Sequence, residues 1–210
     1  MINIFITDDH SIMRDGLKKI LSEERDMKVV GEAANYHDAI TGVAKLEPDV
    51  VILDISLPGR NGLDILKELK STHPKLKVLI LSMHPEERFA LRAIKAGASG
   101  YVTKENAADE LVNAIRKVSA GLKYISADLA GQLADRFGTD FSKVPHEQLS
   151  DREFEVLCKI AEGKSIKEIA EMLVLSPATV ATYRARVLEK MNLKSNVEIT
   201  SYVYRNHLMD

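Results

Sequence analysis

The chain has 210 residues, a formal net charge of −2, 45% hydrophobic and 29% charged side chains, as expected for an ordinary globular protein of one or two domains. This composition excludes a disordered chain, a collagen and a membrane bundle. No apolar run approaches the roughly 18 residues that cross a bilayer, and the N-terminus lacks the basic region of a signal peptide. The single cysteine, Cys158, excludes an internal disulfide and a multi-cysteine metal site. We therefore expect a soluble, cytoplasmic protein.

Residues 1–118 alternate between short apolar runs and stretches with helical spacing. The runs are Ile2–Ile6, Val29–Val30 continuing into Ala33–Ala34, Val50–Leu53, Val78–Leu81 and Tyr101–Val102. Continuous runs are typical of strands buried on both faces of a parallel sheet. The stretch after the first run has apolar residues at helical spacing: Ile12, Leu17, Ile20 and Leu21. Four similar stretches follow, so the pattern predicts an α/β domain with a five-stranded, doubly wound parallel sheet.

The sequence changes character after residue 118. Residues 119–148 contain several glycines and indicate a linker, with spacing for one short helix that includes Leu129 and Phe137. Residues 149–210 predict a second, smaller, all-α domain of four helices. Their starts are marked by the capping boxes Ser150–Glu153, Ser165–Glu168 and Ser195–Glu198, and by Ser176 followed by Pro177. A helix, a tight turn and a second helix with basic residues are typical of a helix-turn-helix.

Polar side chains follow four of the predicted strands. They are Asp8 and Asp9 after the first, Asp54 at the end of the third, Ser82 after the fourth and Lys104 after the fifth. Ligands of such sheets bind beyond the carboxyl ends of the strands, so we expect these groups to meet at one edge. Clustered carboxylates suit Mg²⁺. Asp54 could then attack a phosphoryl group to form an acyl phosphate, with Lys104 and Mg²⁺ neutralising the phosphoryl oxygens and Ser82 donating a hydrogen bond.

These residues resemble the receiver domain of two-component response regulators, which has a flavodoxin-like fold. The resemblance rests on Asp8-Asp9, on the segment Ile52-Leu53-Asp54-Ile55-Ser56-Leu57-Pro58-Gly59-Arg60-Asn61-Gly62, and on Ser82, Tyr101 and Lys104. It implies that Asp54 accepts phosphate from a sensor histidine kinase. It further implies Mg²⁺ ligands in Asp8, Asp9, Asp54 and the backbone carbonyl of Ser56. By the same resemblance, Lys104 pairs with the phosphoryl group, and Ser82 and Tyr101 form a switch.

The third helix of the smaller domain predicts a DNA-reading surface. With 100° per residue, its apolar stripe contains Val180, Tyr183, Val187, Leu188 and Met191, which leaves an outward face of small side chains. Small side chains let a helix press deep into a major groove. The candidate DNA contacts are Thr179, Ala181, Thr182, Arg184, Ala185, Arg186, Lys190 and Lys194. Lys190 and Lys194 suit phosphate contacts, which position the helix but carry no sequence information.

This region resembles the LuxR/NarL-type helix-turn-helix. The resemblance is carried by Leu149–Glu153, Ile160–Ser165, Lys167–Ala170, Ser176–Val180 and Lys190–Met191. Where that family often has Lys and His, this chain has Ala181 and Tyr183, so it lacks one cation that commonly contacts DNA in that family. The whole chain resembles a NarL/FixJ-type response regulator. That implies promoter DNA as a partner, RNA polymerase as a further one, and a homodimer formed on phosphorylation or DNA binding. The last helix, with Val197, Ile199, Tyr202 and Val203, is the candidate dimer contact.

Other functions fit parts of the pattern. A Mg²⁺-dependent phosphohydrolase also uses an aspartate nucleophile and a lysine, but commonly has a second acid where Ser56 stands, so we expect no enzyme beyond the receiver's own phosphoryl transfer and dephosphorylation. A receiver acting by protein contact alone, with a four-helix interaction module, is the third possibility. His84 could tune loss of the phosphoryl group. The remaining histidines show no ligand spacing and are expected at the surface: His10, His37, His73, His146 and His207.

Overall fold

The computed structural model describes residues 1–57, 62–83, 86–126, 130–131, 145–206 and 208. The chain forms two compact units, Met1–Gly131 and Gln132–Asp210. Among the described residues, no helix combines the length and the apolar character needed to span a bilayer.

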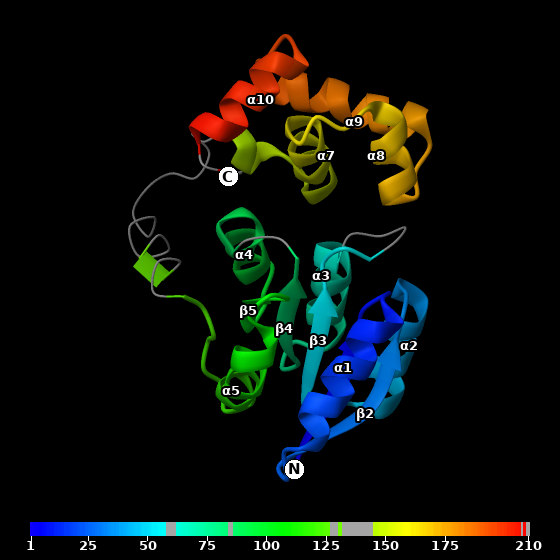
Figure 1. Ribbon diagram of the computed structural model, residues 1–210, viewed down its shortest axis with the longest axis vertical. Helices are drawn as coiled ribbons and strands as arrows, with labels where there is room; N and C mark the ends of the chain where they lie inside the picture. The colour runs from blue at the N-terminus through cyan, green and yellow to red at the C-terminus, as the bar shows by residue number, and fades with distance from the viewer. Residues whose placement is uncertain (58–61, 84–85, 127–129, 132–144, 207, 209–210) are drawn as a thin grey trace. The chain divides into compact units, whose positions relative to one another are not determined.

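The first unit alternates strands and helices along the chain (Figure 1). Its elements are β1 (Ile2–Thr7), α1 (Ser11–Ser22), β2 (Met27–Ala33), α2 (Tyr36–Leu46), β3 (Val50–Asp54), α3 (Gly62–Thr72), β4 (Lys77–Ser82), α4 (Glu86–Lys95), β5 (Gly100–Thr103) and α5 (Ala107–Ser119). All neighbouring strands are parallel, in the order β2-β1-β3-β4-β5. This confirms the doubly wound, five-stranded sheet predicted from the apolar runs.

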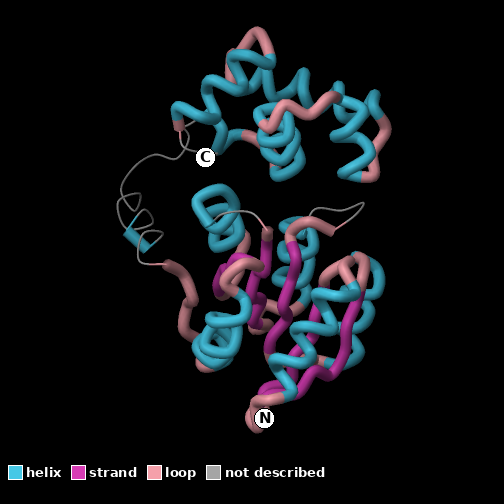
Figure 2. The backbone as a smooth tube through the Cα atoms, in the orientation of Figure 1, coloured by secondary structure: helices cyan, strands magenta, loops and turns pink. Residues whose placement is uncertain are grey.

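Helices cover both faces of the sheet (Figures 1 and 2). On one face, α1 and α5 bury Leu17, Leu21, Leu111 and Ile115 against the strands. The central strand β3 is buried along its whole length, which explains why its sequence is a continuous apolar run. One residue of the expected helical stripe lies elsewhere: Ile12 is 87% exposed, while its neighbour Met13 packs against the core.

The chain after α5 returns to the sheet. The amide of Tyr124 donates to the carbonyl of Ser99 at 3.0 Å, and the amide of Tyr101 donates to the carbonyl of Tyr124 at 3.0 Å. This short parallel bridge lies along β5, the edge strand, and satisfies backbone groups that would otherwise be open to another strand. The first residues of the expected linker therefore pack as part of the first unit. The helix expected around 129–137 falls mostly outside the described residues.

The second unit is helical, with a 3-10 turn η2 (Pro145–Gln148) before α7 (Asp151–Ala161), α8 (Ile166–Leu173), α9 (Pro177–Lys190) and α10 (Asn196–Arg205). Ser150 and Ser165 form the predicted capping boxes, and Ser176 caps α9 with proline at its first turn. Of the third predicted capping box, only the serine cap forms. Ser195 accepts from the amide of Glu198, but the Glu198 carboxylate accepts from the Lys194 amide instead of the Ser195 amide.

Candidate functional site

Four of the predicted polar residues lie at the carboxyl ends of adjacent strands. Asp8 follows β1, Asp54 ends β3, Ser82 ends β4 and Lys104 follows β5. Asp8 and Asp54 are each 1% exposed and Ser82 is fully buried. Because the strands are parallel and adjacent in the order β1-β3-β4-β5, their ends meet at one edge. The topology thus gathers residues up to 96 positions apart in the chain.

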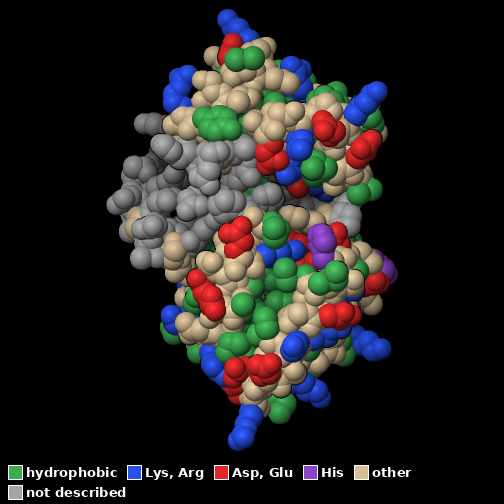
Figure 3. Space-filling model, viewed as in Figure 1, with side chains coloured by type: hydrophobic (Ala, Val, Ile, Leu, Met, Phe, Trp, Pro, Cys, Tyr) green, Lys and Arg blue, Asp and Glu red, His purple; other side chains and the backbone are tan. Residues whose placement is uncertain are grey.

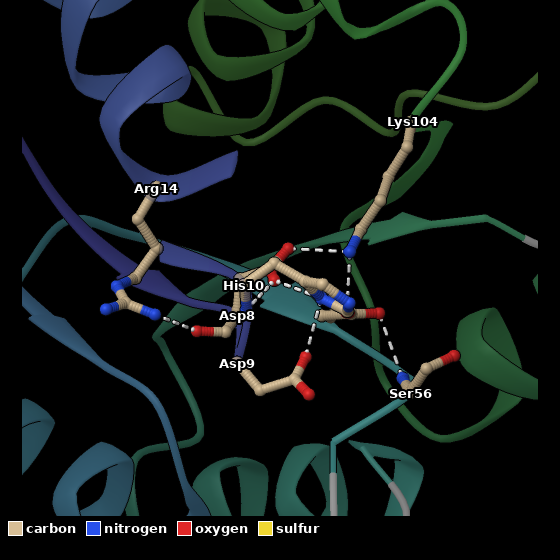
Figure 4. Close-up of polar contacts among 7 residues, drawn as sticks. Asp8, Asp9, His10, Arg14, Ser56 and Lys104 are labelled. Carbon is tan, nitrogen blue, oxygen red and sulfur yellow. Dashed lines mark hydrogen bonds and ion pairs between the residues drawn. The ribbon is translucent and has the colours of Figure 1, made fainter. Parts of the chain in front are cut away.

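Lys104 joins the two buried carboxylates (Figure 4). Its Nζ lies 2.7 Å from Oδ2 of Asp54 and 2.7 Å from Oδ2 of Asp8. Burial raises the pKa of Asp54 above its ordinary value, and the attraction of Lys104 offsets this only in part. Burial opposes the charged form of Lys104 too, but the two carboxylates outweigh it and raise the pKa of Lys104. The ammonium and the carboxylates therefore depend on one another for their charge.

Backbone groups fix the other side of Asp54. Its Oδ1 accepts from the amide of Ser56 at 2.9 Å. The start of α3 lies directly against the backbone of Asp54, where a Cβ on Gly62 would come within 2.4 Å of the Asp54 carbonyl oxygen. Only glycine fits this approach. Residues 58–61, which precede Gly62, lie outside the described residues.

Asp9 and His10 extend the cluster toward solvent. Nδ1 of His10 lies 2.8 Å from Oδ1 of Asp9 and 3.2 Å from Oδ1 of Asp8. One ligand atom each from Asp8, Asp9, His10 and Asp54 lies within 4.8 Å of the others. His10 lies at the surface as predicted, with its side chain 65% exposed, but the expectation that it has no ligand spacing is wrong, because its ring points at the carboxylates (Figure 4). Its position directly after two acids was the available signal.

Arg14 is a second residue that the sequence did not indicate. Its Nη1 donates to the backbone carbonyl of Asp8 at 2.7 Å, and its Nε lies 3.6 Å from Oε1 of Glu32. Arg14 therefore ties the first turn of α1 to the end of β1 and holds the loop that carries the acids.

The donor set fits a divalent cation. Three carboxylates face a single ammonium, so the cluster has an excess of negative charge that a cation would relieve. Carboxylate oxygens are the ligands that hard divalent ions prefer. The acidic pocket is thus compatible with metal binding.

Comparison with known proteins agrees with this geometry. Residues 4–116 match the response regulator receiver domain family, and residues 147–203 match the luxR family of bacterial regulatory proteins. The chain is 37% identical to the response regulator UvrY of Escherichia coli, over 99% of this chain and 96% of UvrY. It is also 37% identical to the response regulator GacA of Pseudomonas aeruginosa, over 100% of this chain and 99% of GacA. The chain belongs to the response regulators.

A solved structure of similar architecture supports the same conclusion. RcsB from Salmonella enterica serovar Typhimurium, bound to promoter rprA in the presence of the phosphomimetic BeF3−, matches with a TM-score of 0.66 and 26% identity, covering 97% of this chain and 99% of RcsB. Response regulators with a receiver and a luxR-type domain regulate transcription through phosphorylation-dependent DNA binding, and this chain is one of them. It is a regulator and not a classical enzyme.

The predicted switch residues of this response regulator are both buried. Ser82 is fully buried and Tyr101 is 3% exposed. Ser82 pairs with Thr103 in the sheet register, and its carbonyl accepts from the amide of Lys104 at 2.8 Å. The end of β4 is therefore hydrogen-bonded directly to the residue that contacts Asp54. His84, the residue considered for tuning phosphate loss, lies outside the described residues.

The face of α9 predicted to read DNA is open to solvent. Val180, Val187 and Met191 are buried, as expected, and the exposed residues are Ala178, Ala181, Thr182, Ala185, Arg186, Glu189 and Lys190. Thr179 and Arg184 are partly buried, and Lys194 is exposed beyond the helix. Two of the cations have partners within the unit. Nε of Arg184 donates to Oδ1 of Asn196 at 2.6 Å, and Nζ of Lys190 lies 2.6 Å from Oε2 of Glu153, a carboxylate that is 3% exposed.

Two expectations for the second unit are wrong. Ile199 and Val203 are fully buried, because α10 packs them against α7, so they cannot form a dimer contact. Of that set, Val197 is exposed and Tyr202 is partly buried. His146 is also buried, with Nδ1 2.9 Å from the Tyr202 hydroxyl and its ring against Phe154. His207 lies outside the described residues.

Proposed function

We propose that Asp54 is the phosphoacceptor and that its phosphorylation controls the binding of α9 to promoter DNA. The observation that carries this proposal is the shared ion pair of Lys104 with Asp8 and Asp54 at the carboxyl edge of the sheet. The donor is a phosphohistidine of a sensor kinase. An oxygen of Asp54 forms a bond to phosphorus, the phosphorus–nitrogen bond breaks, and the imidazole keeps that electron pair. Lys104 already contacts the nucleophile and remains to neutralise the new charge.

We assign Mg²⁺ as the cofactor, held by Asp8, Asp9, Asp54 and the backbone carbonyl of Ser56. The excess of carboxylates over cations in the cluster supports this set. When bound, the ion supplies positive charge for the phosphoryl oxygens. The same pocket would also support the regulator's own dephosphorylation, and no further turnover is proposed. Ser82 is assigned the hydrogen bond to a phosphoryl oxygen, with Tyr101 transmitting the change along β5.

An apolar groove beside the acidic pocket supports the kinase as a partner. Hydrophobic side chains gather on the face between α1 and α5 (Figure 3). The groove is lined by His10, Ile12, Met83 and Lys104, together with further residues of α1 and α5. Ile12 is 87% and Met83 62% exposed, so two large apolar side chains of one groove are open to a partner, as at protein interaction sites. A docked kinase would cover them while it presents its histidine to Asp54.

Labelling with a small phosphoryl donor tests the phosphoacceptor. Asp54→Asn should take no label from phosphoramidate, because an amide cannot form the acyl phosphate. Asp64→Asn, which changes an exposed aspartate in the first turn of α3, should be labelled like the unaltered protein. Full labelling of Asp54→Asn would show that another residue accepts phosphate.

For the second unit, we propose that Thr179, Ala181, Thr182, Ala185 and Arg186 face the major groove, and that Arg184, Lys190 and Lys194 contribute to phosphate contact. The exposed, small-residue face of α9 supports this assignment. Lys190 also neutralises buried Glu153, so its removal would disturb the fold and the DNA contact together. Lys194→Ala is the cleaner test. It should weaken binding similarly for all sequences and reduce the salt slope by about one unit. A loss confined to one base position would contradict a phosphate role.

We propose that the regulator binds promoter DNA as a homodimer and therefore acts in the cytoplasm. A solved structure of two RcsB dimers bound to two parallel DNAs supports this arrangement. Exposed Val197 remains a candidate contact on α10, whereas the buried residues of that helix are withdrawn. A two-fold dimer would favour paired half-sites. RNA polymerase stays a predicted further partner. Sedimentation with and without BeF3− and a promoter duplex measures the dimer directly.

A further inference from the structure

The acidic pocket contains a nitrogen donor that an all-oxygen Mg²⁺ site does not need. His10 stands directly after Asp8 and Asp9, and its Nδ1 lies 2.8 Å from Oδ1 of Asp9 and 3.2 Å from Oδ1 of Asp8. One ligand atom from each of Asp8, Asp9, His10 and Asp54 lies within 4.8 Å of the others. A single cation could therefore contact the imidazole and the carboxylates at once.

The two oxygens of Asp8 face different neighbours. Oδ2 faces Nζ of Lys104 at 2.7 Å, whereas Oδ1 faces the amide and the ring of His10. Oδ2 of Asp54 is likewise engaged with Lys104. A cation bound at Oδ1 of Asp8, Oδ1 of Asp9 and Nδ1 of His10 would therefore leave the Lys104 pairs intact. The cluster thus has a lysine side and a histidine side.

The histidine side is held in place by the backbone. The amide of His10 donates to Oδ1 of Asp8 at 2.8 Å, which forms a tight turn at the start of α1. Arg14 donates to the carbonyl of Asp8 at 2.7 Å and fixes the same turn from the other side. These contacts fix the backbone that carries His10, and the ring itself is held by its contacts with Asp8 and Asp9. Because the ring is 65% exposed, a hydrated ion can still approach it from solvent.

We propose that His10 is a direct metal ligand through Nδ1 and that it gives this pocket a preference for first-row transition ions such as Mn²⁺ over Mg²⁺. The inference rests on the proposed metal site at Asp8, Asp9 and Asp54. Oxygen ligands alone suit Mg²⁺, whereas imidazole adds affinity for the later divalent ions, since Mg²⁺ gains little from a nitrogen donor. His10 is then the residue that determines which ion supports phosphorylation.

Electron paramagnetic resonance with Mn²⁺ tests this in the full-length protein. Free Mn²⁺ gives a six-line signal, so its loss measures binding, and competition with Mg²⁺ measures preference. His10→Ala should lower the Mn²⁺ affinity by about tenfold or more, since even the loss of a residue that only supports a ligand typically costs that much, and should change the Mg²⁺ affinity by less than about twofold. His37→Ala, which removes an exposed histidine on α2, should change neither affinity. Electron spin echo of bound Mn²⁺ should show nitrogen modulation in the unaltered protein and none in His10→Ala.

A second variant separates ligation from orientation. His10→Asn keeps an N–H donor for the carboxylates, but the only atom it can offer a cation is an oxygen, so it should show no nitrogen modulation and should lose the preference for Mn²⁺ over Mg²⁺. If bound Mn²⁺ shows no nitrogen modulation in the unaltered protein, or if His10→Asn keeps the full preference for Mn²⁺, His10 only orients the acids and the inference is overturned. Equal losses of Mn²⁺ and Mg²⁺ affinity would have the same meaning. If neither ion binds the unaltered protein, the proposed metal site itself fails.

Discussion

Replacing Lys104 with methionine removes the ammonium that contacts two buried carboxylates. The side chain is 3% exposed, and its Nζ lies 2.7 Å from oxygens of Asp8 and Asp54, each 1% exposed. Removing one partner of a buried ion pair leaves an uncompensated charge and typically costs about 3–5 kcal/mol. Because so little of this contact is exposed, we expect the free energy of unfolding of the first unit to fall by that amount at neutral pH in metal-free buffer.

The pH dependence follows from Asp54. Its pKa is raised in the folded state by burial, so the folded form holds the proton more tightly than the unfolded chain does. Its contribution to stability is therefore present at low pH and is lost as the pH rises through the folded pKa. Lys104→Met removes the cation that lowers the pKa of Asp54, so the loss of stability should grow from pH 5 to pH 7, at most by about 1.4 kcal/mol per pH unit.

Urea unfolding followed by the backbone amide signals of β3 and β4 measures this loss in the first unit alone. Lys19→Met, which removes an exposed lysine from α1, should change stability by less than about 0.5 kcal/mol. Adding Mg²⁺ should restore part of the loss, because a cation that binds only the folded state stabilises it. A loss below about 1 kcal/mol, or one that is equal at both pH values, would refute the argument that Lys104 holds the two carboxylates in place.

Three further predictions concern separate parts of the protein. Burial would raise the pKa of Glu153, but Lys190 and Ser150 outweigh burial and lower this pKa. The ionised Glu153 therefore stabilises the second unit at pH values above its unfolded pKa, and this stabilisation is lost as the pH falls. In Glu153→Gln, amide exchange in α7 should show about 1–3 kcal/mol less stability at pH 7 and a smaller loss of stability on acidification. Val174 is a β-branched residue at φ 53° and is 63% exposed, so Val174→Gly should raise the urea midpoint of the second unit, by relief of strain of about 1 kcal/mol; a lower midpoint would contradict this. Gly62→Ala should displace Asp54 and slow its phosphorylation, because the new Cβ would collide with the Asp54 backbone. The control Gly16→Ala has open space around its Cβ, so it should leave labelling unchanged and stabilise α1 by about 0.5–1 kcal/mol. Equal labelling of both variants would show that the approach of Gly62 to Asp54 has no role.

Patterns that depend on neighbouring residues could be interpreted from the sequence. A strand buried on both faces needs a continuous apolar run, so Val50–Leu53 predicted β3 without knowledge of its partners. Serine caps are equally local, and Ser150, Ser165 and Ser176 lie where the sequence predicts helix starts. Ser195 shows the limit of this reasoning, because its cap forms but the Glu198 carboxylate turns to a different amide.

The meeting of Asp8, Asp54 and Lys104 was predictable because parallel strands end at the same edge, whatever the details of packing. Side-chain direction was not predictable in this way. His10 turns toward the acids and Arg14 toward the loop because of contacts that exist only after α1 packs on the sheet.

The sequence by itself determined the alternation of strands and helices, the helix starts and the polar groups at the strand ends, because each of these features depends only on residues that are close together along the chain. Only the tertiary structure decided that Lys190 neutralises Glu153, 37 residues away, and that Ile199 and Val203 belong to the core. These outcomes depend on which face of one helix meets another. An apolar stripe is compatible with a core or an interface, and a lysine with solvent or a buried acid, until packing brings distant segments together.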